Sequence, residues 1–460
     1  MQFCYCGISN NKIDNVNECQ LSAELKQEIH SYEAVANKII EEIVHGKFKG
    51  HTYDMLAKFI DKFGPRLTGT QNLEDSIDYM VELSKNLSLS NVYTEQVTVP
   101  AWKRGPASLR ISSPINREIP VMAIGLSNGG KVTAEAVVVA SFQELEALSD
   151  DQIKNKIVVY NPAFTSYGET VKYRSRGASV AAAKGASAAL VRSVTQKSIR
   201  SIHTGMQTYL PNTNKIPVGT ISLEDADMLH RIHKRGEKIV LELDIDTSLS
   251  EGTSRNTFVD LSGSQPNISR PIVVVSGHID SWDIGDGAMD DGGGVMVSLA
   301  ALHFMKELSL TAKRTVRAIF WTAEEQGLLG AEAHVKSHKE EEDLLSFAME
   351  SDMGTFAPRG LDFSGSHEAG CIIQEILQLL SPINATEFKT PLDGGPDITF
   401  WAQNGVPASS LLNANEEYFW YHHSVGDSML VEDPHNLDLC AAVWTVVSYV
   451  VADLNMPLPR

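Results

Sequence analysis

Cysteine is scarce in this sequence, with five residues among 460 and no two in a CxxC spacing. A cysteine-based metal site is therefore disfavoured, and the cysteines are expected to be structural or solvent-facing thiols. Basic residues are also in deficit: 39 lysines and arginines face 58 aspartates and glutamates, giving a net charge of −19. Because nucleic-acid binding depends mainly on clustered basic side chains, no nucleic-acid partner is expected.

Long apolar runs and a secretory leader are missing as well. Without a stretch of about 18 or more apolar residues, the sequence predicts no membrane span. The first ten residues, MQFCYCGISN, lack the basic start and apolar stretch of a signal peptide. They fit either a cytosolic protein or a chain recorded without its leader. Three triplets would accept glycans on entry into the secretory pathway, at Asn86, Asn267 and Asn384.

The composition that is present, 43% hydrophobic and 21% charged, is typical of a globular protein with a sizeable core. Residues 1–21 form an N-terminal extension, and helical spacing of apolar residues follows, with a first strand expected at 92–99. Residues 112–250 change to short strand-like runs, which indicate an inserted domain. This segment has no cluster of His, Asp and Glu, so we expect it to act as a lid or packing module.

The main domain, residues 22–111 and 251–460, has an α/β pattern. Strands and helices alternate after residue 270, as in a mostly parallel sheet with helices on both faces. Strands are expected at 272–275, 315–321, 347–349 and 408–412, and helices at 294–308, 328–337 and 434–451. Since ligands bind beyond the carboxyl ends of such strands, the polar residues that follow each strand are the candidates for chemistry.

The first polar cluster follows the strand at 272–275. His278 and Asp280 stand at its carboxyl end, and a glycine-rich turn then brings Asp290 and Asp291 to the start of a helix. Imidazole and carboxylate suit zinc in a hydrolase, and one carboxylate can bridge two cations. Two alternatives stay open here, because His278 fits a hydrogen-bonded core histidine and Asp290 fits a helix cap.

Carboxylates and histidines also follow the other strands. Glu324 and Glu325 come directly after the strand at 315–321, where two buried like charges would be relieved by a nearby dication. A solvated charge pair is the alternative. Asp352 follows the next strand, and an aromatic-rich loop carries His422 and His423, of which only one needs to point inward.

Taken in order, these motifs identify a resemblance. HID, AMDDGGG, WTAEEQGLLGA, MESDMG and YHHSVGD are similar to the di-zinc exopeptidases of the aminopeptidase and glutamate carboxypeptidase type. The likeness covers nearly the whole chain, from GISN and GPRLTGTQNLE through KIVVYN to CAAVWTVVSYVVAD. It implies a three-layer α/β fold with a mixed, mostly parallel sheet and an inserted protease-associated-type domain. It also implies small peptide substrates, a homodimer, and a secreted or lysosomal location.

The resemblance implies a role for each polar residue. Two Zn²⁺ ions per chain would be held, one by His278 and Asp352, the other by Glu325 and His423, with Asp290 bridging both. His423 is chosen over His422 because the family's ligand directly precedes a small hydroxyl residue. Glu324 would be the general base, Asp280 would orient His278, Asp427 would orient His423, and the Asp290–Asp291 peptide would be cis.

Substrate contacts and competing functions are less constrained. Tyr421, among other aromatics that could equally be core, would wall a short pocket, and Asp397 would meet a substrate ammonium or cap a helix. Relatives of this fold that have lost their ligands serve as receptors or scaffolds, but here every ligand position is filled. Glutaminyl cyclases use a related fold with one zinc, which the paired-metal set disfavours.

Overall fold

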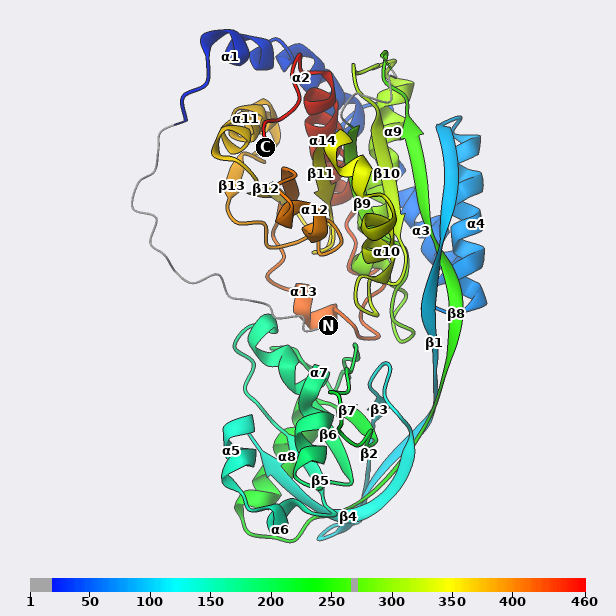
Figure 1. Ribbon diagram of the computed structural model, residues 1–460, viewed down its shortest axis with the longest axis vertical. Helices are drawn as coiled ribbons and strands as arrows, with labels where there is room; N and C mark the ends of the chain where they lie inside the picture. Colours follow the sequence, from blue (N-terminus) through cyan, green and yellow to red (C-terminus); the bar gives the residue numbers. More distant parts are fainter. Residues whose placement is uncertain (1–18, 266–271) are drawn as a thin grey trace.

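A computed structural model describes residues 19–265 and 272–460, so the sequon at Asn267 lies outside the described residues. One continuous sheet runs through the molecule. It passes from the compact upper body in Figure 1, which holds most of the main domain, into the smaller lower body, which holds most of the inserted segment 112–250. Within the upper body, the order β14–β11–β9–β10 is parallel throughout. These strands are Ile272–His278 (β9), Val316–Trp321 (β10), Leu345–Glu350 (β11) and Ala408–Asn413 (β14). The expected mostly parallel sheet is confirmed.

The edges of this sheet are mixed. β12 (Pro358–Ser364) runs antiparallel to β14, and β13 (Glu387–Lys389) pairs with β12 in parallel. On the other side, β8 (Val240–Leu261) runs antiparallel to β10. The four parallel strands therefore form the centre of the sheet, where their carboxyl ends meet at one edge.

Helices cover both faces of the sheet because the strands carry apolar side chains on both faces. Val273 and Val275 of β9 pack in a core with α9 (Gly293–Glu307) and α14 (Pro434–Asp453), whereas Val274 packs on the opposite face. That second face carries α10 (Leu329–Ser337) and α12 (Thr399–Gln403). Successive side chains of a strand alternate between faces, so an unbroken apolar run requires cover on each. Outside α9 and α14 lie α2 (Glu33–Val44) and α3 (His51–Phe63), whereas α4 (Gln71–Asn86) packs against α3 and β8.

Helix α14 is the one helix, among the described residues, that is long and apolar enough to cross a membrane by length and composition. Its most apolar window is 83% buried inside the protein. The helix packs against α9 and α2, and its apolar residues face the core nearly all round. It is therefore accounted for as a buried core helix.

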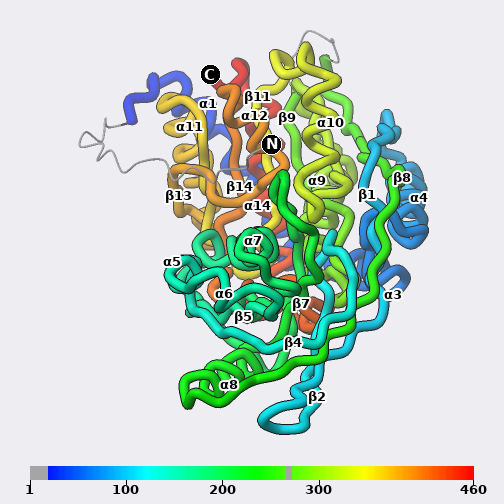
Figure 2. Tube along the Cα trace, turned by 60° about the horizontal axis from the view of Figure 1, so that its bottom comes forward, coloured from blue at the N-terminus to red at the C-terminus, as the bar shows by residue number. Residues whose placement is uncertain are grey.

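Two long strands connect the upper and lower bodies. β1 (Ser90–Ser113) pairs with β8 along its whole length, from Ser90 opposite Asp260 to Ser113 opposite Val240. The first strand is thus much longer than the expected 92–99, and the expected domain boundaries at 111/112 and 250/251 fall inside continuous strands. Figures 1 and 2 show both strands passing from one body to the other.

The inserted segment is built around two apolar cores, one of which also takes in Leu67 and Trp282 of the main domain. β4 pairs with β8 and continues the sheet into the parallel strands β5, β6 and β7, with α7 and α8 packed on them. Their bounds are Gly130–Val139 (β4), Ile157–Tyr160 (β5), Ala188–Arg192 (β6), Val218–Ile221 (β7), Tyr167–Ala183 (α7) and Leu223–Lys234 (α8). In Figure 1, α13 (Tyr418–Tyr421) of the upper body reaches down to α7.

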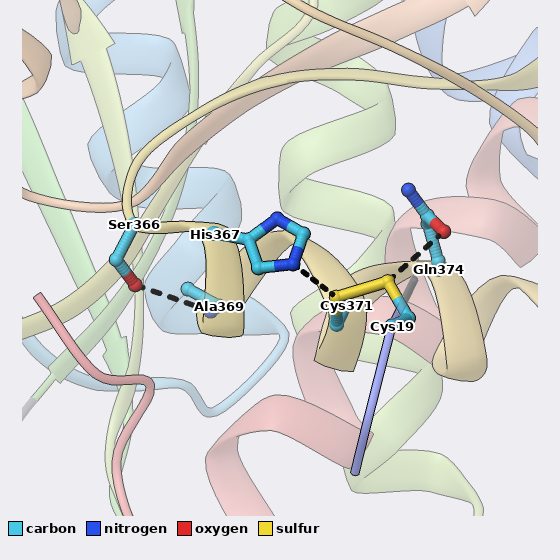
Figure 3. Close-up of a disulfide and its surroundings, with 6 residues drawn as sticks. All are labelled: Cys19, Ser366, His367, Ala369, Cys371 and Gln374. Carbon is cyan, nitrogen blue, oxygen red and sulfur yellow. Dashed lines mark hydrogen bonds between the residues drawn. A yellow bond between two sulfur atoms is a disulfide. The ribbon is translucent and has the colours of Figure 1, made fainter. Parts of the chain in front are cut away.

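A disulfide fastens the start of the described chain to the body. Cys19 is bonded to Cys371 of α11 (His367–Leu377), 352 residues away in sequence, as Figure 3 shows. The expectation that the cysteines are thiols is wrong for this pair, because a partner so distant leaves no spacing signal. Cys440 is free and buried, as expected of a structural thiol.

Candidate metal centre

The polar residues that follow β9, β10 and β11 lie at one edge of the sheet. Trp321 at the end of β10 is paired with His278 at the end of β9, and Glu350 at the end of β11 is paired with Ser276. The parallel register therefore delivers the segments after these strands to the same place. They carry most of the candidate ligands.

The first ligand group surrounds His278, which is completely buried. Its Nε2 lies 3.1 Å from Asp290 Oδ1 and 3.2 Å from Asp352 Oδ1. Its Nδ1 lies 2.9 Å from the carbonyl oxygen of Asp280. A carbonyl can only accept, so Nδ1 carries the proton and Nε2 of the neutral ring is free to bind a cation.

The second group surrounds His423. Its Nε2 lies 2.9 Å from Glu325 Oε2 and 3.3 Å from Asp290 Oδ2. The two oxygens of Asp290 therefore face different groups, Oδ1 toward His278 and Oδ2 toward His423. This is the geometry of a carboxylate that bridges two cations. The expected cis peptide between Asp290 and Asp291 is present.

The neighbouring Asp291 has a separate, structural role. Its Oδ1 accepts from the amide of Gly294 at the start of α9, at 3.0 Å, and its Oδ2 accepts from the amide of His278, at 3.0 Å. The helix cap that was an alternative for Asp290 is thus provided by Asp291. Asp290 itself points to the two histidines.

Both histidines of the aromatic-rich loop point inward. The His422 ring stacks on His423, with centroids 3.5 Å apart, and its Nε2 lies 3.5 Å from Asp290 Oδ2. The expectation that only one needs to point inward is therefore too restrictive. His423 also meets Glu325, which His422 does not within the described contacts, and this favours His423 as the ligand. Burial lowers the pKa of His422 well below its usual range, and His423 adds to this effect.

Buried negative charge accumulates in this centre. Burial raises the pKa of Glu325 well above its usual value, and the charge of Asp290 adds to the rise. Asp290 Oδ2 and Glu325 Oε1 are buried without a hydrogen-bond partner. A cation would satisfy these oxygens and offset the charge repulsion, so the residues fit a metal centre.

Glu324 differs from its neighbour. Its side chain is 17% exposed, against 3% for Glu325, and its Oε2 lies 3.9 Å from His278 Nε2. Burial raises the pKa of Glu324 well above its usual value; His278 opposes the rise, while Asp352 and Glu325 add to it. It is close to the ligand groups, accessible from outside, and suited to exchange a proton.

Two further aspartates hold the backbone around the centre. The carboxylate of Asp280 accepts from the amides of Glu324, at 3.1 Å, and Glu325, at 3.3 Å. Asp280 thus orients His278 through its carbonyl group, while its carboxylate positions the two glutamates. Asp427 accepts from the amides of Met289, at 2.7 Å, and Asp290, at 3.3 Å.

Asp427 was expected to orient His423, and this expectation needs correction. Its hydrogen bonds go to the backbone amides of Met289 and Asp290, and no contact between its carboxylate and the His423 ring is found among the described residues. The Nδ1 of His423 lies instead 3.4 Å from the Thr204 carbonyl oxygen and 3.4 Å from the Arg174 guanidinium. For Nε2 to bind a cation, Nδ1 must donate to Thr204.

The inserted segment contributes contacts to the histidine loop that sequence analysis did not predict. The amide of Thr204 donates to the His423 carbonyl oxygen at 2.9 Å, and His203 Nδ1 donates to the His422 carbonyl oxygen at 2.7 Å. Arg174 donates to Thr204 at 2.9 Å and to the Tyr167 hydroxyl at 2.7 Å. No local sequence motif marks these residues, because they contact the histidine loop only in the folded chain.

Arg66 is a second residue that sequence reasoning missed. It is fully buried, and its guanidinium donates to the carbonyl oxygens of Ile279, Asp286 and Gly287 at 2.7–2.9 Å. These carbonyls belong to the turn between His278 and Asp290. Arg66 therefore fixes the turn that separates these two candidate ligands. The only signal in the sequence was its place in GPRLTGTQNLE, one of the resemblance motifs.

The two expected substrate contacts receive different support. Tyr421 is half-buried beside the histidine loop. Asp397 is fully buried, neither of its carboxylate oxygens has a hydrogen-bond partner, and α12 begins after Ile398 without a side-chain cap. Its burial favours neither a contact with substrate nor a cap. Burial raises the pKa of Asp397 well above its usual value, and Glu350 adds to the rise.

Comparison with known proteins agrees with this geometry. The model of peptidase family M28 matches residues 256–448. Carboxypeptidase Q of Xenopus laevis is 46% identical over 100% of this chain and 97% of its own length. Carboxypeptidase Q of Homo sapiens is 45% identical over 95% of this chain and 93% of its own length.

Solved structures show the same fold. A peptidase M28 precursor from Shewanella amazonensis superposes with a TM-score of 0.89 at 30% identity, covering 94% of this chain and 99% of its own. A zinc aminopeptidase from Bacillus subtilis superposes with a TM-score of 0.69 at 21% identity, covering 90% of this chain and 99% of its own. The chain belongs to peptidase family M28, among the carboxypeptidase Q proteins, and is a metallo-exopeptidase.

Proposed function

We propose that this chain is a di-zinc exopeptidase that hydrolyses small peptides, chiefly dipeptides with free ends. The observation that carries the proposal is Asp290, whose two oxygens face separate histidine–carboxylate groups. His278 and Asp352 would hold one Zn²⁺, and Glu325 and His423 the other. Imidazole nitrogens and carboxylate oxygens are donors that zinc accepts in hydrolases.

The chemistry divides between the ions and Glu324. When bound, the zinc pair would lower the pKa of a water toward ~7 and polarise the scissile carbonyl. Glu324 accepts the proton of that water and returns it to the leaving amine. Its partial exposure and its raised pKa suit a base that takes up and releases a proton.

Substrate size is inferred from what surrounds the histidine loop. Tyr167 of α7 lies edge-on to His422, at 5.1 Å between ring centroids, and stacks on Phe419 at 4.7 Å. The inserted segment thus stands directly beside the proposed zinc ligands. We infer that it closes a short pocket, which would admit a dipeptide more readily than a long chain, with Tyr421 as one wall.

A secreted or lysosomal location and a homodimer belong to the same proposal. The disulfide between Cys19 and Cys371 supports an oxidising compartment, since disulfides are rare in the cytosol. The sequons at Asn86 and Asn384 lie on exposed residues, which a glycan requires.

Metal analysis combined with a dipeptide panel tests the proposal. We expect two zinc ions for catalysis per chain and hydrolysis that a chelator abolishes and added zinc restores. A receptor or scaffold would bind dipeptides without hydrolysing them. An enzyme of the glutaminyl cyclase kind would hold one zinc at this centre and leave the panel intact.

A further inference from the structure

A second histidine–carboxylate cluster lies at the other end of α10. Glu324 and Glu325 precede the first turn of this helix, whereas His334 lies in its last turn and His338 directly follows it. A helix of nine residues spans roughly 13 Å, so the cluster is separate from the proposed catalytic pair. Glu95 of β1 completes it.

The three side chains converge at distances that suit a metal ion. Glu95 Oε2 lies 2.8 Å from His334 Nδ1, and Glu95 Oε1 lies 3.1 Å from His338 Nε2. One ligand atom from each residue falls within 4.8 Å of the other two. A tetrahedral zinc site with bonds of about 2.0 Å places its ligand atoms about 3.3 Å apart. The spacing of the two histidines, four residues apart, puts them on one face of the helix.

The surrounding residues orient both imidazoles. His338 Nδ1 lies 3.3 Å from Glu341 Oε1, so its outer nitrogen has a carboxylate partner while Nε2 faces Glu95. This is the arrangement that metal-bound histidines commonly have. His334 is 5% exposed and packs against the rings of Phe258 and Trp321, at 4.9 and 5.7 Å.

The local charge also favours a dication. The carboxylates of Glu95, Glu341 and Asp260 lie near the Arg317 guanidinium. Asp260 accepts from Arg317 at 2.7 and 3.1 Å. With both histidines neutral, the three carboxylates outnumber the one guanidinium, and a divalent ion would offset the excess negative charge.

We propose that Glu95, His334 and His338 bind one divalent transition-metal ion, with zinc as the best match to these donors. The ion would tie β1 to α10 and so fix the base of the β1–β8 ribbon against the domain that carries the catalytic centre. This site is structural, and it stands independently of the proposed di-zinc function.

Zinc counting on the full chain tests this site. Protein is loaded with zinc chloride, freed of excess ion, and analysed for zinc per chain as wild type and as His338→Gln. We expect the variant to hold one ion fewer while dipeptide hydrolysis stays within about twofold of wild type. The matched control is His30→Gln, which removes a histidine paired with a single carboxylate, Glu375, at 2.7 Å; it should keep the wild-type count.

Equal zinc counts in wild type and His338→Gln would overturn the site. Glu95→Gln is the second variant, for use if His338→Gln does not fold, and it should lose the same ion. Added zinc chloride should raise the Tm of wild type more than that of either variant. If the proposed catalytic zinc pair did not bind, the zinc count would fall equally in wild type and variants. The difference of one ion between them would still be measurable.

Discussion

The upper body and the inserted segment supply the catalytic region in different ways. The upper body contributes the proposed zinc ligands at or just after strand ends, such as His278 and Asp352, and each belongs to a short motif. The inserted segment contributes Arg174 and Thr204, which belong to no motif and act on the backbone and outer nitrogen of His423. Ligand identity is thus encoded locally, whereas ligand orientation depends on a distant part of the chain.

This difference can be tested by removing residues from each side. If the upper body alone holds the metals and performs the chemistry, changes there should abolish function, and changes in the inserted segment should reduce it. The upper body also holds buried carboxyl groups with raised pKa values, such as Glu432. We expect them to make the free energy of unfolding depend on pH.

The largest effect is expected for Asp290→Ala. Its two oxygens face both ligand groups, so neither metal keeps its shared ligand and turnover should fall to background. Zinc per chain and dipeptide hydrolysis are the measurements, with Asp75→Ala on the exposed face of α4 as the control. A variant that keeps full zinc at this centre would contradict the bridging role.

Glu324→Gln should remove turnover while keeping the metals. Loss of a general base costs about 10²–10⁴-fold in kcat, and an amide of the same shape leaves the ligands in place. Glu332→Gln on α10 is the matched control, because that glutamate pairs with Lys336 away from the centre. Near-native turnover in Glu324→Gln would disprove the assignment.

Arg174→Ala should lower kcat/KM by about tenfold, as expected for a residue that orients a metal ligand. It removes a donor to Thr204 and a neighbour of His423, so zinc affinity should weaken along with activity. Arg192→Ala, in the same segment but bonded to Asp227, controls for damage to the inserted fold. Unchanged zinc affinity and kcat/KM would mean that the segment only covers the site.

The smallest effect is expected for Glu432→Gln. Burial raises the pKa of Glu432 to about 8, against the opposing hydrogen bond from Thr355. Between pH 5 and 8 the folded chain keeps a proton that the unfolded chain has released, so this group lowers stability as pH rises. The variant stays neutral, and its Tm should exceed that of wild type by a few degrees at pH 8 and by less at pH 5.

Glu237→Gln in the inserted segment is the comparison for this pH series. Glu237 forms an ion pair with Arg235 at the surface, so its replacement should shift Tm by a similar amount at both pH values. A Tm gain for Glu432→Gln that does not grow with pH would contradict the buried-proton explanation.

The sequence predicted the parallel strands and their polar ends because both signals are local. Apolar runs such as 272–275 mark strands, and residues such as His278 follow them directly. The partner of Cys19, the length of β1 and the true contacts of Asp427 could not be predicted. Each depends on pairing between segments far apart in the chain, which neither spacing nor residue type records.

The paired strands β1 and β8 have a mechanical consequence. Both strands continue unbroken from one body to the other. The two bodies are therefore joined by a paired β-ribbon and not by flexible linkers. The pairing of β1 with β8 is irregular between Arg104 and Ala107, where the register shifts. Any displacement of the inserted segment relative to the larger domain would therefore bend the β1–β8 ribbon and work against its interstrand hydrogen bonds.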